Sequence, residues 1–170
     1  MTINTKTLAA IDIGTNAIRL FISNVEEYPT ETLFKKIAFL RVPIRLGEDV
    51  FTTGEIGQQK RKRLCETMQG FSYIMSAFNV ESYKAYATCA MREARNGKSV
   101  AEQIQKECDL NIEIISGTKE AETIFAGGMN EVVDDDKTYL YVDVGGGSTE
   151  VIVYSKSVKI EACSFPLGTV

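Results

Sequence analysis

Two stretches of the chain, residues 8–22 and 140–153, carry an aspartate followed by a loop of small residues at the same spacing. Each consists of an apolar run, an aspartate, a loop of small residues and a second apolar run. The aspartates are Asp12 and Asp143. The loop residues that could contact phosphate are Gly14, Thr15, Asn16, Gly145, Gly146, Gly147, Ser148 and Thr149. Glycine-rich loops can bring backbone N–H groups close to an anion, and a nearby aspartate can hold a divalent cation.

When Asp12 is aligned with Asp143, no gap is needed, and Arg19 falls on Glu150. Each copy predicts a strand, a tight turn and a second strand. One copy alone would be read as an ordinary β-hairpin, but two matching copies favour a clamp for a phosphate chain. The loop after Asp143 runs into a strand and has no following Lys, which excludes a Walker P-loop and a dinucleotide fingerprint.

Three further side chains are candidates for chemistry on phosphate. Asp143 and Glu150 flank the triple-glycine loop and are suitable ligands for Mg²⁺. Glu120 falls in the first turn of a predicted helix, although acidic residues also favour that position through the helix dipole. Arg92 follows a predicted strand and could grip phosphate with two hydrogen bonds, or simply pair with a surface acid.

Cys89 and Arg95 have the Cys-x5-Arg spacing of cysteine phosphatases, but the intervening residues lack the glycines that such a loop needs. The chain has no His, which excludes Ser-His-Asp triads and histidine-based phosphatase mechanisms. The four cysteines show no Cys-x-x-Cys spacing and are expected to be buried free thiols. Acid–base chemistry must therefore come from other side chains.

The chain of 170 residues is 44% hydrophobic and 25% charged, with a formal net charge of −4. These values are typical of a globular protein and give no basic footprint for nucleic acid. No apolar run reaches membrane-spanning length, and the start lacks the pattern of a signal peptide. We therefore expect a cytoplasmic protein without a nucleic-acid or membrane partner.

The predicted elements describe an α/β protein. Strands at 8–14, 17–25 and 31–42 are joined by short turns and should pair antiparallel. Pro43 to Gly54 is predicted to be a loop. After residue 83 strands alternate with helices, which indicates parallel strands with crossover helices. These later elements are strands at 83–88 and 111–116, one helical turn at 90–94, and helices at 99–107 and 118–130.

The clearest helix spans 55–79, with an apolar stripe formed by Leu64, Met68, Phe71, Met75 and Phe78. The basic run at 60–63 precedes this stripe, and is either a solvated turn or a landing patch for an anion. Ser99 and Glu102 form a capping-box signature for the next helix.

The acidic segment within 131–137 is the predicted domain boundary. It separates a first domain, residues 1–130, from the beginning of a second, residues 131–170. The second copy has only three predicted strands, the last at 158–164, and no covering helices. We therefore expect the chain to be a fragment in which the second domain is truncated.

The motifs resemble the N-terminal part of the exopolyphosphatase/guanosine pentaphosphate phosphatase (Ppx/GppA) family. The resemblance rests on six segments in the family's order: residues 11–16, 45–48, 87–94, 115–121, 142–150 and 166–168. It implies the actin-like ATPase or sugar-kinase superfold with ribonuclease H-like domains, in which a mixed sheet has flanking helices. It also implies Mg²⁺-dependent cleavage of terminal phosphoanhydride bonds in inorganic polyphosphate or guanosine pentaphosphate (pppGpp).

The resemblance also implies roles for individual residues. Glu120 matches the catalytic glutamate that orients or deprotonates water, and Asp143 and Glu150 match the acids that hold the metal and assist catalysis. Residues along the phosphate path are Asn16, Arg92, Gly145, Ser148 and Thr169. The family often has two adjacent acids where this chain has Lys119-Glu120.

Two other functions remain open from the sequence. One is an ATP-dependent kinase or ATPase of the same superfold, and the other is a non-catalytic sensor of polyphosphate or nucleotides. The sequence does not choose between polyphosphate and pppGpp, and it leaves open whether the protein forms a homodimer.

Overall fold

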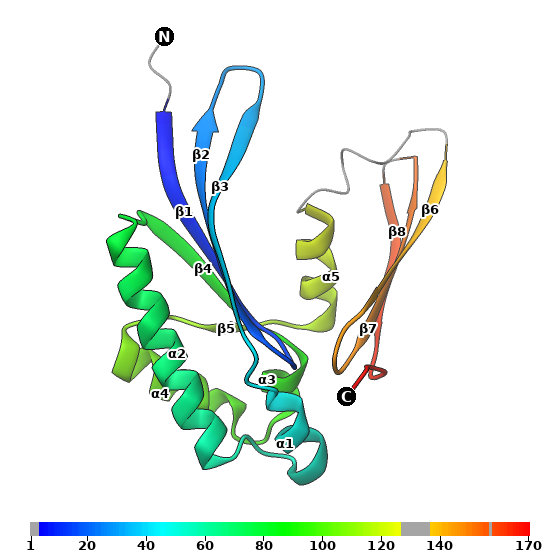
Figure 1. The fold of residues 1–170 in the computed structure, drawn as a ribbon. Helices are drawn as coiled ribbons and strands as arrows, with labels where there is room; N and C mark the ends of the chain where they lie inside the picture. Colours follow the sequence, from blue (N-terminus) through cyan, green and yellow to red (C-terminus); the bar gives the residue numbers. More distant parts are fainter. Residues whose placement is uncertain (1–3, 127–136, 157) are drawn as a thin grey trace.

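A computed structural model describes residues 4–126, 137–156 and 158–170 of the chain. They form two separate sheets that stand side by side, with helix α5 (Gly117–Ala126) between them (Figure 1). The first sheet has five strands in the order β3-β2-β1-β4-β5, and the second has three in the order β6-β7-β8. The predicted domain boundary at 131–136 lies outside the described residues.

The first sheet is mixed, as predicted. Strands β1 (Asn4–Ile13), β2 (Ile18–Glu27) and β3 (Thr32–Val42) pair antiparallel through short turns. Strands β4 (Ser82–Ala87) and β5 (Glu113–Ile114) join them in parallel, β4 beside β1 and β5 beside β4. The C-terminal ends of β1 and β4 therefore lie side by side, where the first of the two repeated loops begins.

Helices α2 (Gln58–Ala77) and α4 (Gly97–Cys108) pack together and cover one face of this sheet (Figure 1). The predicted stripe of α2 is buried except for Phe78, which is 41% exposed because it follows the last helical residue. Helix α4 begins before Ser99, so the predicted capping box was wrong. The side chain of Asn96 instead bonds the backbone of Ile56 and ties the start of α4 to that segment.

Two short helices lie near the edge of the first sheet that carries the loop. The helical turn predicted at 90–94 forms helix α3 (Cys89–Glu93). The predicted loop at 43–54 was wrong, because Leu46–Thr53 forms helix α1. Gly47 suggested a loop, but it is inside the helix and leaves room for Thr15, since a Cβ there would lie 2.4 Å from the Thr15 methyl.

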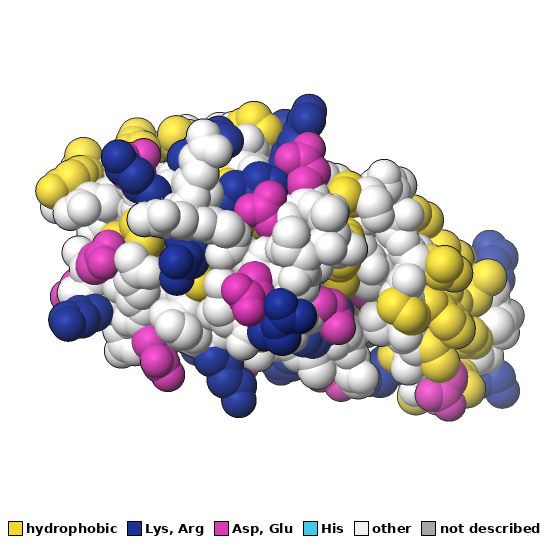
Figure 2. All heavy atoms as spheres, turned by 90° about the horizontal axis from the view of Figure 1, so that it is seen from below, with side chains coloured by type: hydrophobic (Ala, Val, Ile, Leu, Met, Phe, Trp, Pro, Cys, Tyr) yellow, Lys and Arg dark blue, Asp and Glu magenta, His cyan; other side chains and the backbone are white. Residues whose placement is uncertain are grey.

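The second sheet is antiparallel and consists of β6 (Thr138–Val144), β7 (Thr149–Ser155) and β8 (Val158–Phe165). Helix α5 packs on one face through a small cluster of Ala121, Ile152 and Tyr154. Other apolar residues of this sheet are exposed, and Figure 2 shows hydrophobic side chains gathered on this side of the molecule. They include Leu140, Val142, Val144, Val158 and Ile160.

The cysteines are all free thiols, as predicted. Three of them are buried, but Cys163 on β8 is exposed, so the expectation of burial was wrong for that residue. The first residue of the basic run before the α2 stripe is not free in solvent. Lys60 forms ion pairs with Glu48 and Asp49 of α1, and its side chain is only 14% exposed. No helix among the described residues is long and apolar enough to cross a membrane.

Candidate active site

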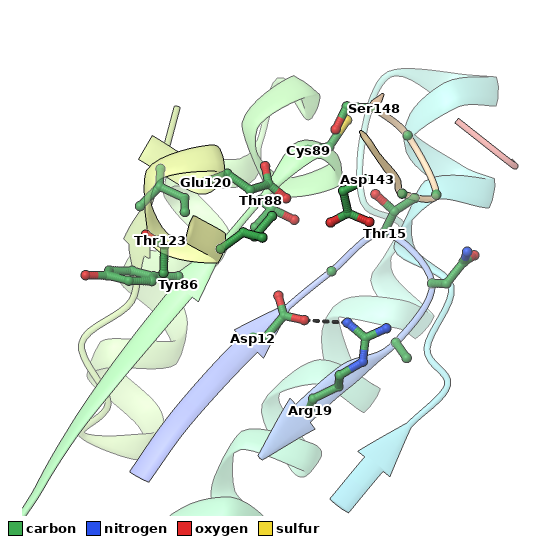
Figure 3. A pocket seen from close by; sticks show the side chains of 18 of the residues that line it. Asp12, Thr15, Arg19, Tyr86, Thr88, Cys89, Glu120, Thr123, Asp143 and Ser148 are labelled. Atoms are coloured by element: carbon green, nitrogen blue, oxygen red, sulfur yellow. Dashed lines mark hydrogen bonds and ion pairs between the residues drawn. The ribbon is translucent and has the colours of Figure 1, made fainter. Parts of the chain in front are cut away.

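A cleft of about 780 Å³ lies between the first sheet, α5 and the second sheet. Both repeated loops line it, and so do the four carboxylates Asp12, Glu120, Asp143 and Glu150. Figure 3 shows the side chains of Asp12, Glu120 and Asp143 around the same space, each from a different element. The fold thus brings together groups that are up to 138 residues apart in the sequence, counting from Asp12 to Glu150.

The two repeated hairpins have the same geometry. Asp12 pairs with Arg19 across the first hairpin, and Asp143 pairs with Glu150 at the equivalent position of the second. In the first turn the amide of Gly14 donates to the carbonyl of Ala17 (3.1 Å). In the second turn the amide of Gly145 donates to the carbonyl of Ser148 (2.8 Å). The sequence repeat is therefore a structural repeat.

Both turns leave three consecutive backbone amides for a ligand. No residue in the described part of the chain accepts a hydrogen bond from these amides. The six residues that carry them all line the cleft. They are Thr15, Asn16 and Ala17 in the first loop and Gly146, Gly147 and Ser148 in the second. Successive amides of this kind form a concave binding site for anions such as phosphate.

The glycines of the second loop allow the two loops to touch. A Cβ on Gly146 would lie 2.8 Å from the Asn16 side-chain nitrogen, and one on Gly147 would lie 2.5 Å from the ring of Phe51. Real Cβ atoms do not approach other atoms this closely. Gly146 and Gly147 therefore allow the second loop to pack closely against the first loop and α1.

Three of the acidic residues in the cleft have distinct surroundings. Glu150 is only 1% exposed and its Oε1 accepts a hydrogen bond from Ser164 (2.9 Å). Burial raises the pKa of Asp143, the Glu150 carboxylate adds to this shift, and Arg19 opposes it. Asp12 is paired with Arg19 at 2.5 Å (Figure 3). The cleft therefore concentrates negative charge on the second hairpin.

Glu120 is held in the first turn of α5. The Ser116 hydroxyl caps this helix by accepting from the Lys119 amide (3.1 Å), and the Glu120 amide donates to the Ser116 carbonyl (2.9 Å). Burial and then the charge of Glu150 raise the pKa of Glu120 to about 7, while Arg92 opposes the shift. A carboxylate with this pKa can accept a proton near neutral pH.

Arg92 lies beside Glu120 rather than on the cleft lining. Its Nη1 donates to the carbonyl of Ile115 (3.1 Å) and to Oε2 of Glu120 (3.4 Å), and its Nε is 3.5 Å from Glu93. It lines an adjoining cavity of about 560 Å³. Cys89, Gly147 and Ser148 line both cavities. The guanidinium thus lines a cavity that shares Gly147 and Ser148 of the second loop with the main cleft.

Of the three predicted threonines, Thr15 and Thr169 line the cleft and Thr149 does not. Thr169 lines the cleft, and its amide donates to the carbonyl of Gly145 (3.1 Å). Thr149 is not among the residues that line the cleft, and its hydroxyl donates to the carbonyl of Leu167 (2.6 Å). Thr149 therefore links the end of the second loop to residue Leu167.

The thiol of Cys89 does not have the environment of a nucleophile. Burial raises its pKa, and the partial compensation by Arg92 does not reverse the shift. The reactive form of cysteine is the thiolate, so the raised pKa argues against Cys89 as a nucleophile.

The carboxylates in the cleft fit a magnesium ion that takes some of its ligands from the protein and the rest from water and substrate. The described residues contain no group of three carboxylate, thiol or imidazole side chains that converge on one metal position. Mg²⁺ in phosphoryl-transfer sites commonly takes one or two carboxylates, with water and substrate phosphate completing the shell. Asp143 and Glu150, which line the cleft on either side of the triple-glycine loop, are the carboxylates that could hold such an ion.

Two residues with a place in the site were not identified from the sequence as site residues. Arg19 pairs with Asp12, and its alignment with Glu150 in the repeat was the available signal. Ser164 bonds Glu150, and no local pattern around it indicates this contact, which depends on strand pairing.

Comparison with known proteins agrees with this arrangement. A sequence model of the Ppx/GppA phosphatase family matches residues 11–170. The chain is 31% identical over 166 residues to a bifunctional 3-dehydroquinate synthase/phosphatase of Fusobacterium nucleatum, covering 95% of this chain and 25% of that protein. It is 27% identical over 166 residues to exopolyphosphatase 1 of Mycobacterium tuberculosis, covering 95% of this chain and 46% of that protein.

Solved structures show the same similarity. The crystal structure of an exopolyphosphatase from Cytophaga hutchinsonii has a TM-score of 0.85 at 29% identity, covering 96% of this chain and 51% of that one. The ethanolamine utilization protein EutJ from Carboxydothermus hydrogenoformans, at 13% identity and a TM-score of 0.51, shares the fold alone, covering 99% of this chain and 54% of that one. These neighbours confirm the predicted actin-like ATPase fold. The chain spans about half the length of these solved structures, and half or less of the two curated relatives.

Proposed function

The chain belongs to the Ppx/GppA phosphatase family, and we propose that it forms the catalytic cleft of a phosphoanhydride hydrolase. The substrate would be inorganic polyphosphate, from which terminal phosphate is released, or pppGpp, which would be converted to ppGpp. The observation that carries this proposal is the position of Glu120. Its carboxylate has a pKa near 7 and lines the same cleft as both anion-binding loops.

The attacking group in this proposal is a water molecule held by Glu120. A general base works best when its pKa lies near the operating pH, and it typically contributes about 10²- to 10⁴-fold to the rate. Glu120 would take a proton from the water while the oxygen of that water attacks the terminal phosphorus. The bond to the bridging oxygen then breaks, and the shortened chain leaves as an anion.

The phosphoryl oxygens would be stabilised by the backbone amides of the two loops. Charge stabilisation by fixed donors is effective because the donors need no reorganisation during the reaction. Arg92 would contribute from the side of Glu120, where its Nη1 already lies 3.4 Å from the carboxylate. A negatively charged substrate would then compete with Glu120 for the guanidinium.

A divalent cation, which we propose to be Mg²⁺, would be held by Asp143 and Glu150. When bound, such an ion would supply positive charge that neutralises charge on the substrate phosphates. Burial, and then the charge of the Glu150 carboxylate, raise the pKa of Asp143, and a bound cation would offset both effects. The carboxylates themselves position the ion beside the triple-glycine loop.

The names of relatives favour polyphosphate as the first substrate to test, because exopolyphosphatases are among them. The test is release of orthophosphate by the full-length protein from long-chain polyphosphate and from pppGpp, each with Mg²⁺. Release from either substrate supports the proposal. Binding of both substrates without release would instead indicate a sensor.

A further inference from the structure

Ser164 joins the two elements that carry Glu150 and Glu120. It lies directly opposite Glu150 in the pairing of β7 with β8. Its Oγ donates a hydrogen bond of 2.9 Å to Oε1 of Glu150. Because Glu150 is only 1% exposed, water has little access to replace this bond. The strand register thus gives a buried carboxylate one fixed hydrogen-bond donor.

The same serine touches the beginning of α5. A Cβ built on Gly117 would lie 2.5 Å from Cβ and 2.6 Å from Oγ of Ser164. Gly117 is the first residue of the helix, and Glu120 follows three residues later in the same turn. The first turn of α5 therefore rests on Ser164 at a distance that only glycine permits.

These two contacts have a common consequence for the cleft. The Glu150 side chain has one oxygen engaged by Ser164 and still lines the cleft. Gly117 contacts Ser164 at the start of the helical turn that carries Glu120. Groups behind a metal-binding carboxylate often matter nearly as much as the ligand, because they fix its orientation.

We propose that Ser164 is a positioning residue for both acidic groups of the site. Its hydroxyl fixes the orientation of Glu150, and its contact with Gly117 sets the position of Glu120. This inference rests on the proposed function, because it assigns a role to a residue within that site. Ser164 does not line the main cleft, and it lines the adjoining cavity together with Arg92.

The test compares Ser164→Ala with Ser164→Thr, which keeps the hydroxyl, in the full-length protein. Ser155→Ala is the matched control, because Ser155 also makes a hydroxyl hydrogen bond, to Thr138 (2.9 Å), in the same sheet. The measurements are kcat and KM for phosphate release, Mn²⁺ affinity from electron paramagnetic resonance, and the thermal midpoint. Rates are compared well below the midpoint of each variant.

We expect Ser164→Ala to lower kcat and Mn²⁺ affinity about 10- to 100-fold, with KM for the substrate nearly unchanged. Ser164→Thr should recover most of the Mn²⁺ affinity, and Ser155→Ala should match the unmodified protein. A lower thermal midpoint with unchanged kcat and unchanged Mn²⁺ affinity would overturn the inference.

The failure of the proposed function would look different. If the unmodified protein released no phosphate, the proposed function would fail, and the Mn²⁺ measurement would still decide the role of Ser164. Loss of affinity in Ser164→Ala but not in Ser155→Ala would then support the positioning of Glu150.

Discussion

The Nη1 atom of Arg92 lies 3.4 Å from Oε2 of Glu120, so a positively charged side chain lies directly beside the proposed base. Both side chains are largely buried, with 23% and 18% of their surfaces exposed. Burial raises the pKa of Glu120 to about 7 although Arg92 acts in the other direction. The pair therefore sets the protonation state of the base, and its members can be tested separately.

The first prediction concerns the dependence of the rate on pH. Because a general base must be ionised, kcat/KM should fall about tenfold for each pH unit below about 7 and level off above it. The measurement is a pH profile at saturating Mg²⁺. A rate that stays flat down to pH 5 would contradict the assignment of Glu120 as the base.

The same raised pKa predicts an effect on stability. Glu120 has a higher pKa in the folded protein than in the unfolded chain, so its stabilising contribution is full below pH 4.5 and is lost as pH rises through about 7. Glu120→Gln should therefore raise the thermal midpoint at pH 9 relative to the unmodified protein, but not at pH 4.5. Thermal unfolding at both pH values measures this difference.

The sequence predicted much of the site because the repeat is local. Asp12 and Asp143 each follow a strand and precede a tight turn, and such patterns can be recognised without knowing how distant segments pack. Glu120 was identified through its place at the start of a helix together with the family resemblance.

Other features could not be predicted because they depend on contacts between distant segments. Gly47 suggested a loop, yet it is a helical residue that makes room for Thr15. The bond between Ser164 and Glu150 depends on the register of two strands. Arg92 was predicted to lie along the phosphate path, but no sequence pattern indicated that it pairs with Glu120.

The third prediction concerns the effect of Arg92 on the pH dependence of the rate and on KM. Arg92→Ala removes the cation that opposes the pKa shift of Glu120, so the lower limb of the pH profile should move to higher pH. KM should also rise, since a phosphate ligand is lost. The control is Arg95→Ala, because Arg95 pairs with Glu55 and is 68% exposed. Equal profiles for the two variants would argue against the role of Arg92.

The fourth prediction concerns the metal. Asp143→Asn removes a carboxylate beside the triple-glycine loop, and the Mg²⁺ concentration for half-maximal activity should rise about 10- to 100-fold. Asp109→Asn is a matched control at the end of α4, where the φ of 53° also suits asparagine. Mg²⁺ titrations of the two variants give the comparison, and an unchanged midpoint for Asp143→Asn would exclude it as a ligand.

The fifth prediction concerns the close contact between Gly168 and the second loop. A Cβ on Gly168 would lie 2.2 Å from the carbonyl oxygen of Gly146. Gly168→Ala should therefore displace the loop, lower the unfolding free energy by about 1–3 kcal/mol and reduce kcat/KM. In contrast, Gly70→Ala has open space within α2 and should stabilise the protein by about 0.5–1 kcal/mol. Thermal unfolding of both variants distinguishes these outcomes.

The most direct test of the proposed function is orthophosphate release by the full-length protein, with Mg²⁺, from long-chain polyphosphate and from pppGpp in parallel. The comparison is with Glu120→Gln, which keeps the shape of the side chain but cannot act as a base. We predict release from at least one substrate, a loss of about 10²-fold or more in kcat in the variant, and retained substrate binding. Unchanged release by Glu120→Gln, or no release by the folded, unmodified protein from either substrate, would contradict the account.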